Sequence, residues 1–195
     1  MLESICTPII ENTDIHRVVD LFAGTGSVGY ALSPYKSIVS NDLEYYSFLL
    51  NEAILNGCLM SVDELDSLFA TINRNYKVAH DYLAHEISEE EKHLAAPLDT
   101  YKEYASFSNN TPSVFNKESG LNTFSKLKDL VNMVRPGNKE QDTPFPCLFV
   151  TYFANAYFGI RQCCQIDAIT SAIAEIPDNR QRSVLLAALM TATSS

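Results

Sequence analysis

The fold is decided by the stretch Val18-Val19-Asp20-Leu21-Phe22-Ala23-Gly24-Thr25-Gly26-Ser27-Val28-Gly29. It opens with an apolar run, ends in closely spaced glycines and is followed by apolar residues at helical spacing. This order predicts a strand, a glycine turn and a helix. Glycines at the end of a strand let the backbone turn sharply and approach a ligand closely, and the amides of the following helix then face that ligand.

A second β-prone run covers residues 37–40 and closes with Asn41-Asp42. Helical periodicity then returns over residues 45–55. Together with the first stretch, this makes a β-α-β unit, in which the two strands run parallel. The sequence therefore predicts an α/β domain.

Residues beyond 56 carry mostly helical signals. The patterns Ser61-x-x-Glu64 and Ser88-x-x-Glu91 have the form of a capping box and predict helix starts. The acidic run Glu89-Glu90-Glu91 suits a first helical turn, where the helix dipole favours negative charge. Residues 106–120, rich in Ser, Asn and Thr, predict a loop, and residues 147–153 fit either a strand or a buried helical turn. Further helices are expected over residues 2–10, 124–134, 166–173 and 184–190.

The composition is that of a globular protein, since 46% of the 195 residues are hydrophobic and 19% are charged. This length fits one domain, or one domain with a helical appendage. The longest apolar runs, such as residues 184–190, are far shorter than the roughly 18 to 20 residues of a membrane-spanning helix. The first residues have no basic flank before an apolar core, so we expect no secretory signal and a cytoplasmic location.

Charge is distributed unevenly along the chain. Residues 1–100 hold 5 Lys or Arg against 16 Asp or Glu, a balance of -11, whereas residues 101–195 hold 9 against 8, a balance of +1. The first half therefore repels a polyanion. The one basic concentration consists of Lys126, Lys128, Arg135 and Lys139. Such a group is either a solvated helix face or a contact to DNA phosphates.

The five cysteines do not form a recognisable framework. Their number is odd, no C-x-x-C pair occurs, and the four histidines are not at ligand spacing from them. Neither a disulfide framework nor a zinc site is indicated, and no metal is expected. We expect reduced and mostly buried thiols.

The glycine stretch is open to two interpretations. Gly24, Gly26 and Gly29 satisfy G-x-G-x-x-G, with Asp42 downstream where an acid would bind ribose hydroxyls, as in nicotinamide dinucleotide oxidoreductases. However, the longer string D-x-F-x-G-x-G from Asp20 resembles motif I of S-adenosylmethionine-dependent DNA methyltransferases. Ser40-Asn41-Asp42 is similar to the end of the second strand in the DNA adenine-N6 methyltransferases. A later segment, 149–162 with Ile166-Asp167-Ala168-Ile169, is similar to the region before the catalytic motif of some of these enzymes.

The resemblance implies a Rossmann-like fold and S-adenosylmethionine as cofactor. Its methionine part would lie over Phe22, Gly24 and Gly26, and its ribose hydroxyls on Asp42. The implied cofactor contacts are Asp20, Phe22, Ala23, Gly24, Thr25, Gly26 and Asp42. As structural alternatives, the glycines form only a tight turn, Asp42 only caps a helix, and Asp20 only orders the loop.

The catalytic motif of that family is missing from the chain. These enzymes use a D-P-P-Y tetrapeptide to hold the adenine amine and stack a flipped-out base. No Pro-Pro pair occurs here; Asp142-Thr143-Pro144-Phe145 and Asn155-Ala156-Tyr157-Phe158 are only partial echoes, and the catalytic residues stay unassigned. The resemblance thus implies a split or truncated enzyme, with double-stranded DNA and a D-P-P-Y-bearing chain or segment as partners. Arg161, after an aromatic cluster, is a further candidate DNA contact.

These interpretations divide the chain into three parts. Residues 1–56 form the cofactor-binding β-α-β unit of an incomplete methyltransferase domain, and residues 57–146 a mainly helical insertion that is a candidate target-recognition segment. Residues 147–195 hold the aromatic segment and the C-terminal helices that lead toward the catalytic part. The expected function is site-specific methylation of adenine N6 in DNA, of restriction-modification or defence type. The alternative is a non-catalytic S-adenosylmethionine-binding or scaffold subunit.

Overall fold

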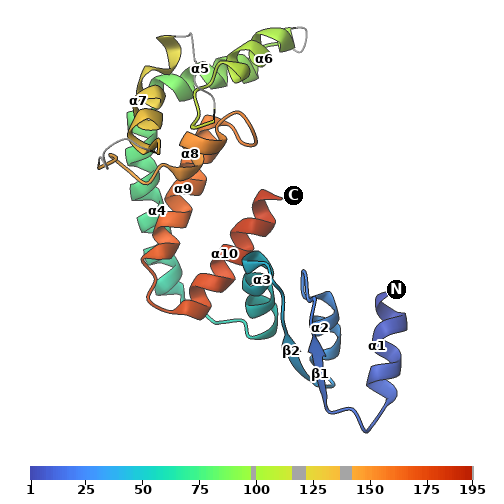
Figure 1. Cartoon of the computed structure of the whole chain (residues 1–195). Helices are drawn as coiled ribbons and strands as arrows, with labels where there is room; N and C mark the ends of the chain where they lie inside the picture. The colour runs from blue at the N-terminus through green and yellow to red at the C-terminus, as the bar shows by residue number, and fades with distance from the viewer. Residues whose placement is uncertain (98–99, 116–121, 137–141, 195) are drawn as a thin grey trace. The chain divides into compact units, whose positions relative to one another are not determined.

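The computed structural model describes residues 1–97, 100–115, 122–136 and 142–194. They form two compact units: unit 1 comprises Met1–Glu64 and Ile173–Ser195, and unit 2 comprises Leu65–Ala172 (Figure 1). The boundary expected after residue 56 lies close to the first transition between units. The segment expected over residues 147–195 is divided between the two.

Unit 1 contains the predicted β-α-β unit. Strand β1 (Arg17–Asp20) pairs in parallel with β2 (Ser37–Ser40), with Val18 opposite Ile38 and Asp20 opposite Ser40. Helix α2 (Ser27–Leu32) connects the strands, and α3 (Tyr45–Leu55) follows β2. In the described residues the sheet has two strands and the remainder is mostly helical. The α/β prediction is therefore confirmed as a small parallel sheet in a largely helical molecule.

Two further helices lie wholly in unit 1, and α4 begins in it, among the described residues. Helix α1 (Leu2–Glu11) packs on α2, and α10 (Asn179–Thr193) packs along α3 (Figure 1). Helix α4 (Val62–Tyr82) starts here, and its predicted capping box is confirmed: the Ser61 amide donates to Glu64 Oε2 at 2.7 Å, and the Glu64 amide donates to Ser61 Oγ at 3.2 Å. Asp178 caps α10 by accepting from the amides of Arg180 and Gln181.

Many large apolar side chains of unit 1 are exposed. The exposed fraction is 54% for Val19 in β1, 89% for Phe22 after it and 97% for Leu43 after β2. Parallel sheets are ordinarily covered on both faces. The sheet of unit 1 thus leaves apolar surface uncovered that such sheets normally bury.

The regular elements of unit 2 are helices in its described residues, and an isolated parallel bridge joins Ala154 to Phe158. After most of α4 it contains α5 (Ala84–Ala95), α6 (Tyr101–Asn109), a short 3-10 helix (Asn122–Phe124), α7 (Ser125–Val134), α8 (Leu148–Phe153) and most of α9 (Ile160–Ala174). Residues 147–153, which fitted a strand or a helical turn, therefore form a helix. The loop predicted over 106–120 is wrong at its start, because α6 continues to Asn109, while residues 116–121 lie outside the described part. None of the helices in the described ranges is long and apolar enough to cross a membrane.

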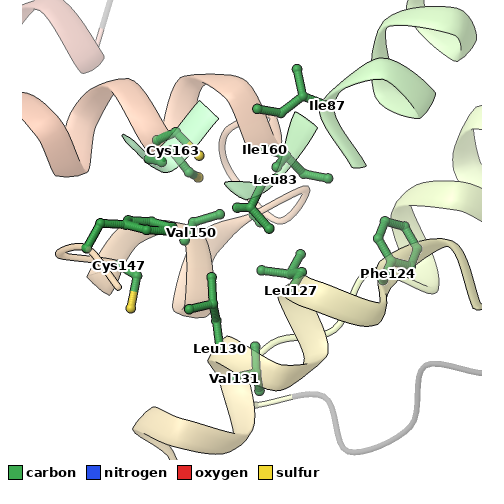
Figure 2. Packing of buried hydrophobic residues seen from close by; sticks show 14 of the residues in the cluster. Leu83, Ile87, Phe124, Leu127, Leu130, Val131, Cys147, Val150, Ile160 and Cys163 are labelled. Carbon is green, nitrogen blue, oxygen red and sulfur yellow. The ribbon is translucent and has the colours of Figure 1, made fainter. Parts of the chain in front are cut away.

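The core of unit 2 is built mainly by α5, α7, α8 and α9, to which α4, α6 and the short 3-10 helix add buried side chains (Figure 2). Phe124, Leu127 and Leu130 are fully buried there. Ile160 and Cys163 face them from α9, and Figure 2 shows these side chains converging. Burial raises the pKa of the Cys163 thiol and raises that of Cys164 to about 12. Cys147, Cys163 and Cys164 are buried, as expected, and their raised pKa values keep the three thiols protonated at neutral pH.

Three carboxylates are also buried in unit 2, and each one caps a helix that is remote in the sequence. Glu86, Glu90 and Asp167 are each at most 2% exposed. Glu86 accepts from the first amides of α7, Glu90 from those of α9 and Asp167 from those of α8. Because helix N-termini carry unpaired amides and a partial positive charge, each carboxylate finds both hydrogen bonds and favourable electrostatics.

The acidic run at residues 89–91 does not start a helix. Helix α5 begins at Ala84, so Ser88-x-x-Glu91 lies within it and the second capping box is wrong. The reason is tertiary: Leu83, which is fully buried, precedes the first residue of the helix, and Glu90 is used to cap α9. Glu91 instead forms an ion pair with Arg161 at 3.0 Å.

The Glu90 carboxylate lies close to the backbone at Gly159. Its oxygens accept from the amides of Ile160 at 2.6 Å and Arg161 at 3.2 Å. A Cβ at position 159 would stand 3.0 Å from Oε1 and 3.1 Å from Oε2 of Glu90. The absence of a side chain at Gly159 therefore allows the cap to reach α9.

Candidate functional site

The glycine turn between β1 and α2 needs glycine at two positions. Gly24 has a φ of +51° and Gly26 a φ of +80°, in the left-handed region that residues with a side chain rarely adopt. The turn is closed by a bond from the Gly26 amide to the Ala23 carbonyl at 2.8 Å. Ala23 is itself tied to the end of β2, because its amide donates to the Asn41 carbonyl at 3.0 Å. The turn is thus fixed at the carboxyl end of both strands.

The two glycines have different surroundings. A Cβ placed on Gly24 would meet no atom within 4 Å, so the space beside this residue is open. A Cβ on Gly26 would lie 2.8 Å from Oδ1 of Asn51. Gly24 therefore leaves room for a ligand, whereas Gly26 is required by packing against the protein itself.

Asp42 links the turn to the start of α3. Its Oδ2 accepts from the Gly24 amide at 2.8 Å, and its Oδ1 accepts from the Glu44 amide at 3.0 Å. These bonds, that from Glu44 first and that from Gly24 next, hold the pKa of Asp42 below its usual value, so the carboxylate is ionised at neutral pH. A carboxylate has about four acceptor positions, and these two amides leave others for a ligand.

The remaining residues of the predicted cofactor set lie around the same turn. Asp20 orders the loop, because its Oδ1 accepts from the Phe22 amide at 3.3 Å. The Phe22 ring is exposed, and Ala23 is buried beneath the turn. The Thr25 hydroxyl lies 3.2 Å from that of Ser27 at the exposed start of α2. All seven residues of the predicted cofactor set thus lie at the glycine turn. Within it, the contact of Asp20 is with the backbone of the loop.

A hollow of about 340 Å³ adjoins Asp42 between β2 and α3. Its wall includes Asn41, Asp42, Phe48 and Asn51. Asn51 was missed by the sequence reasoning, although an asparagine that is buried within the mainly apolar run 45–55 is an unusual feature and the one signal that could have found it.

The candidate DNA-contact residues belong to unit 2 and differ in their contacts. Lys126 and Lys128 are exposed on α7, and the Lys126 ammonium lies 5.1 Å from the centre of the Tyr82 ring. Arg135 donates to the Ser113 carbonyl at 3.2 Å, and Arg161 is paired with Glu91. Lys139 lies outside the described residues.

The two segments that partly match the catalytic motif, residues 142–145 and 155–158, each contain a residue with structural contacts. Phe145 is buried and packs edge-on against Tyr82. Asn155 has a φ of +54°, and its side-chain amide donates to Thr111 Oγ1 at 2.9 Å. These contacts give Phe145 and Asn155 structural roles.

Comparison with known proteins identifies the family. The model of the D12 class N6 adenine-specific DNA methyltransferases matches residues 1–128. The chain is 33% identical over 98 residues to the type II methyltransferase M.FokI of Planomicrobium okeanokoites, which covers 45% of this chain and 15% of that protein. It is 48% identical over 40 residues to the type II methyltransferase M.NlaIII of Neisseria lactamica, covering 20% of this chain and 12% of that protein.

The chain therefore spans less than a fifth of the length of these two curated relatives. No solved structure matches it. The family match covers the glycine turn, Asp42 and Asn51, and it confirms the resemblance seen in the sequence. The chain belongs to the D12 class of N6 adenine-specific DNA methyltransferases.

Proposed function

We propose that this chain is the S-adenosylmethionine-binding portion of a site-specific DNA adenine-N6 methyltransferase of restriction-modification type. The observation that carries the proposal is the glycine turn, which is held by Asp42 and has open space beside Gly24. Family membership and the two type II relatives support it. In this proposal unit 1 is an incomplete Rossmann-like domain, to which unit 2 adds a helical subdomain.

The residues present fit this cofactor. The open side of Gly24 and the exposed Phe22 ring would receive its methionine part. Asp42, ionised and with acceptor positions left, would hold its ribose hydroxyls. Asp20, Ala23, Thr25 and Gly26 shape the loop around these contacts. When bound, S-adenosylmethionine supplies a methyl group activated on a sulfonium.

Methyl transfer requires groups that this chain does not carry. The adenine amine needs acceptors aligned with the methyl donor, and positioning is the main contribution an enzyme can make to this displacement. The family's D-P-P-Y motif provides them, and no Pro-Pro pair occurs in this sequence. We therefore assign that motif to a second chain or segment that completes the small sheet. The exposed Val19 of β1 and the exposed Leu21 and Phe22 that follow this strand support this assignment.

Double-stranded DNA is the proposed substrate, and we expect this chain alone to bind it weakly. Two of the candidate cations, Lys126 and Lys128, are exposed, whereas Arg161 is neutralised by Glu91. Lys139 and Arg135 complete the proposed contact set. Such a small set of cations and a formal charge of -10 predict weak, salt-sensitive binding, which fluorescence anisotropy at two salt concentrations would measure.

Calorimetric titration tests cofactor binding. The chain should bind S-adenosylmethionine or its demethylated product, and Asp42→Ala should raise the Kd by about 10- to 100-fold, as expected for lost hydrogen bonds to a charged group. Asp63→Ala, which removes an exposed acid of unit 1 outside the turn, is the matched control and should leave the Kd unchanged. Binding of a nicotinamide dinucleotide in place of both ligands would contradict the proposal.

A radiolabelled methyl-transfer assay tests the division of the enzyme. The lone chain should transfer no methyl group to mixed-sequence DNA, and addition of a chain with a D-P-P-Y motif that completes the site should restore transfer. Turnover by the lone chain would contradict the proposed division. Cofactor binding without transfer in any such mixture would favour the alternative, a non-catalytic cofactor-binding subunit.

A further inference from the structure

Gly24 is held through both of its backbone groups. Its amide donates to Asp42, and its carbonyl accepts from Nδ2 of Asn51 at 3.1 Å. The same Nδ2 donates to the Ser47 carbonyl one turn earlier on α3, at 2.8 Å. Asn51 therefore ties the glycine turn to the main chain of α3.

This contact sets the direction of one peptide plane. The described chain contains no cis peptide bond. In a trans peptide the carbonyl and the following amide point in opposite directions. With the Gly24 carbonyl fixed toward Asn51, the Thr25 amide is directed away from α3.

The other end of the same side chain sets the position of Gly26. A Cβ at Gly26 would lie 2.8 Å from Asn51 Oδ1, closer than real Cβ contacts allow. The amide orientation is well determined, because exchanging Oδ1 and Nδ2 would place an oxygen opposite two carbonyl oxygens. Asn51 thus contacts both left-handed glycines of the turn, one through each end of its amide.

The burial of Asn51 indicates why its chemistry matters. The residue is 6% exposed, and its Oδ1 has no hydrogen-bond partner among the described residues. A buried acceptor without a partner is costly, so an apolar residue would be the more stable choice if this position served packing alone. The two bonds that Nδ2 donates, to the carbonyls of Gly24 and Ser47, offset this cost. They also connect two separate backbone segments.

We infer that Asn51 is a positioning residue: it holds the glycine turn in the shape that the cofactor meets. The identity of that ligand rests on the proposed function. The contact between Asn51 and the turn does not depend on it. Asn51 also lines the hollow beside Asp42, but the inference requires only its hold on the turn. No residue of α3 was in the set derived from the sequence.

The decisive variant is Asn51→Asp, which keeps the shape and loses the donor at neutral pH. The matched control is Asn110→Ala, which removes a side-chain amide bonded to its own helix, to the Ser106 carbonyl at 2.8 Å, in unit 2. Circular dichroism at each pH establishes that the variants are folded.

Amide hydrogen exchange of the ligand-free chain gives the first measurement. In Asn51→Asp at pH 8, protection of the Gly24 and Gly26 amides should fall by about 10-fold or more, the equivalent of about one hydrogen bond. Burial raises the pKa of the introduced carboxyl group, so at pH 5 part of it is protonated and can donate one hydrogen bond, and protection should return in part toward the wild-type value. Unchanged protection in the folded variant at pH 8 would overturn the inference.

Cofactor titration gives the second measurement. The Kd for S-adenosylmethionine should rise about 10-fold or more in Asn51→Asp at pH 8, recover in part at pH 5, and stay unchanged in Asn110→Ala. If the wild-type chain binds no S-adenosylmethionine, the proposed function fails, and the exchange measurement still decides the role of Asn51. An unchanged Kd in Asn51→Asp, with binding by the wild type, would overturn the inference.

A mutant cycle covers the case in which Asn51→Asp does not fold. Gly26→Ala should loosen protection at Gly24, because its Cβ would push against Asn51 Oδ1. In an Asn51→Ala background that collision is gone, so the added effect of Gly26→Ala should be several-fold smaller. Equal effects in both backgrounds would contradict a direct hold of Asn51 on the turn.

Discussion

Phe124 in unit 2 is fully buried, whereas Phe22 in unit 1 is 89% exposed. The contrast extends to the surroundings of each ring. Phe124 packs against Phe107 within the buried core of unit 2, at a centroid distance of 4.9 Å. Phe22 follows a strand whose Val19 is also exposed.

The polar groups of the two units differ in the same way. In unit 2, buried carboxylates such as Glu90 cap helices from within the core. In unit 1, Asp42 and the α10 cap Asp178 act closer to the surface. Unit 2 thus has a buried helical core, whereas unit 1 has the glycine turn together with exposed apolar side chains. The proposed cofactor contacts therefore belong to unit 1, and the large buried core belongs to unit 2.

The largest effect expected is on the core of unit 2. Phe124→Ala should lower the free energy of unfolding of unit 2 by about 3–5 kcal/mol, because it removes a fully buried ring. Phe22→Ala should change the free energy of unfolding little and should weaken S-adenosylmethionine binding. Urea denaturation and calorimetry give the two values. If Phe124→Ala and Phe22→Ala lowered the free energy of unfolding equally, the contrast between a buried core in unit 2 and an exposed ring in unit 1 would be wrong.

Buried and exposed helix caps give the next contrast. Glu90→Ala should cost about 3 kcal/mol, since it leaves the buried amide of Ile160 and that of Arg161 without their acceptor. Asp178→Ala, at an exposed cap of α10, should cost about 1 kcal/mol. Both are measured by urea denaturation. A larger cost at Asp178 would show that unit 1 depends on its caps more than unit 2 does.

The stability of unit 2 should depend on pH through Asp167. Burial, the largest influence, raises the pKa of this carboxyl from 3.8 to about 7, against the opposing effect of the amides of Phe149 and Val150. The folded state therefore binds the proton more tightly than the unfolded state. Its contribution to stability is present below about pH 4 and is lost as the pH rises through about 7, with a slope of at most about 1.4 kcal/mol per pH unit.

Asp167→Asn removes the titrating group and should flatten this part of the profile. Thermal or urea denaturation of both proteins between about pH 4 and pH 8 provides the measurement. A wild-type stability that rises with pH over this interval, by an amount that Asp167→Asn abolishes, would reverse the sign and contradict the assigned cause.

The smallest effect is expected at an exposed ion pair of unit 2. Arg161 and Glu91 are about half exposed, so their pairing should contribute less than about 1 kcal/mol. A double-mutant cycle with Arg161→Ala and Glu91→Ala at low and high salt measures it. A coupling that persists at high salt would mark the pair as part of the core organisation of unit 2.

Local order was predictable from the sequence, particularly in unit 1. The run at residues 37–40 and the helix at 45–55 have the predicted limits, because strands, glycine turns and capping patterns depend on neighbours in sequence. The six residues of the cofactor set between Asp20 and Gly26 lie together for the same reason, and the parallel pairing of β1 and β2, which the sequence also predicted, brings Asp42 to them. Whether those residues bind the cofactor stays a prediction.

Long-range contacts were not predictable. Glu90 was expected in the first turn of its helix, but it caps α9, 70 residues further along the chain. Asn51 contacts Gly24 across 27 residues, and its place in the apolar run 45–55 marks it as unusual without predicting that partner. In both cases the signal is a polar residue that becomes buried, and burial is decided by packing between elements rather than by periodicity.

Gly159 shows what such packing means for the evolution of this chain. A Cβ there would stand 3.0 Å from a carboxylate oxygen that two amides hold in place, so the carboxylate would have to shift by a few tenths of an ångström. We therefore expect Gly159→Ala to be better tolerated together with a shorter acid, as in Glu90→Asp. Related sequences should therefore exchange these two residues as a pair, although they are distant in the chain.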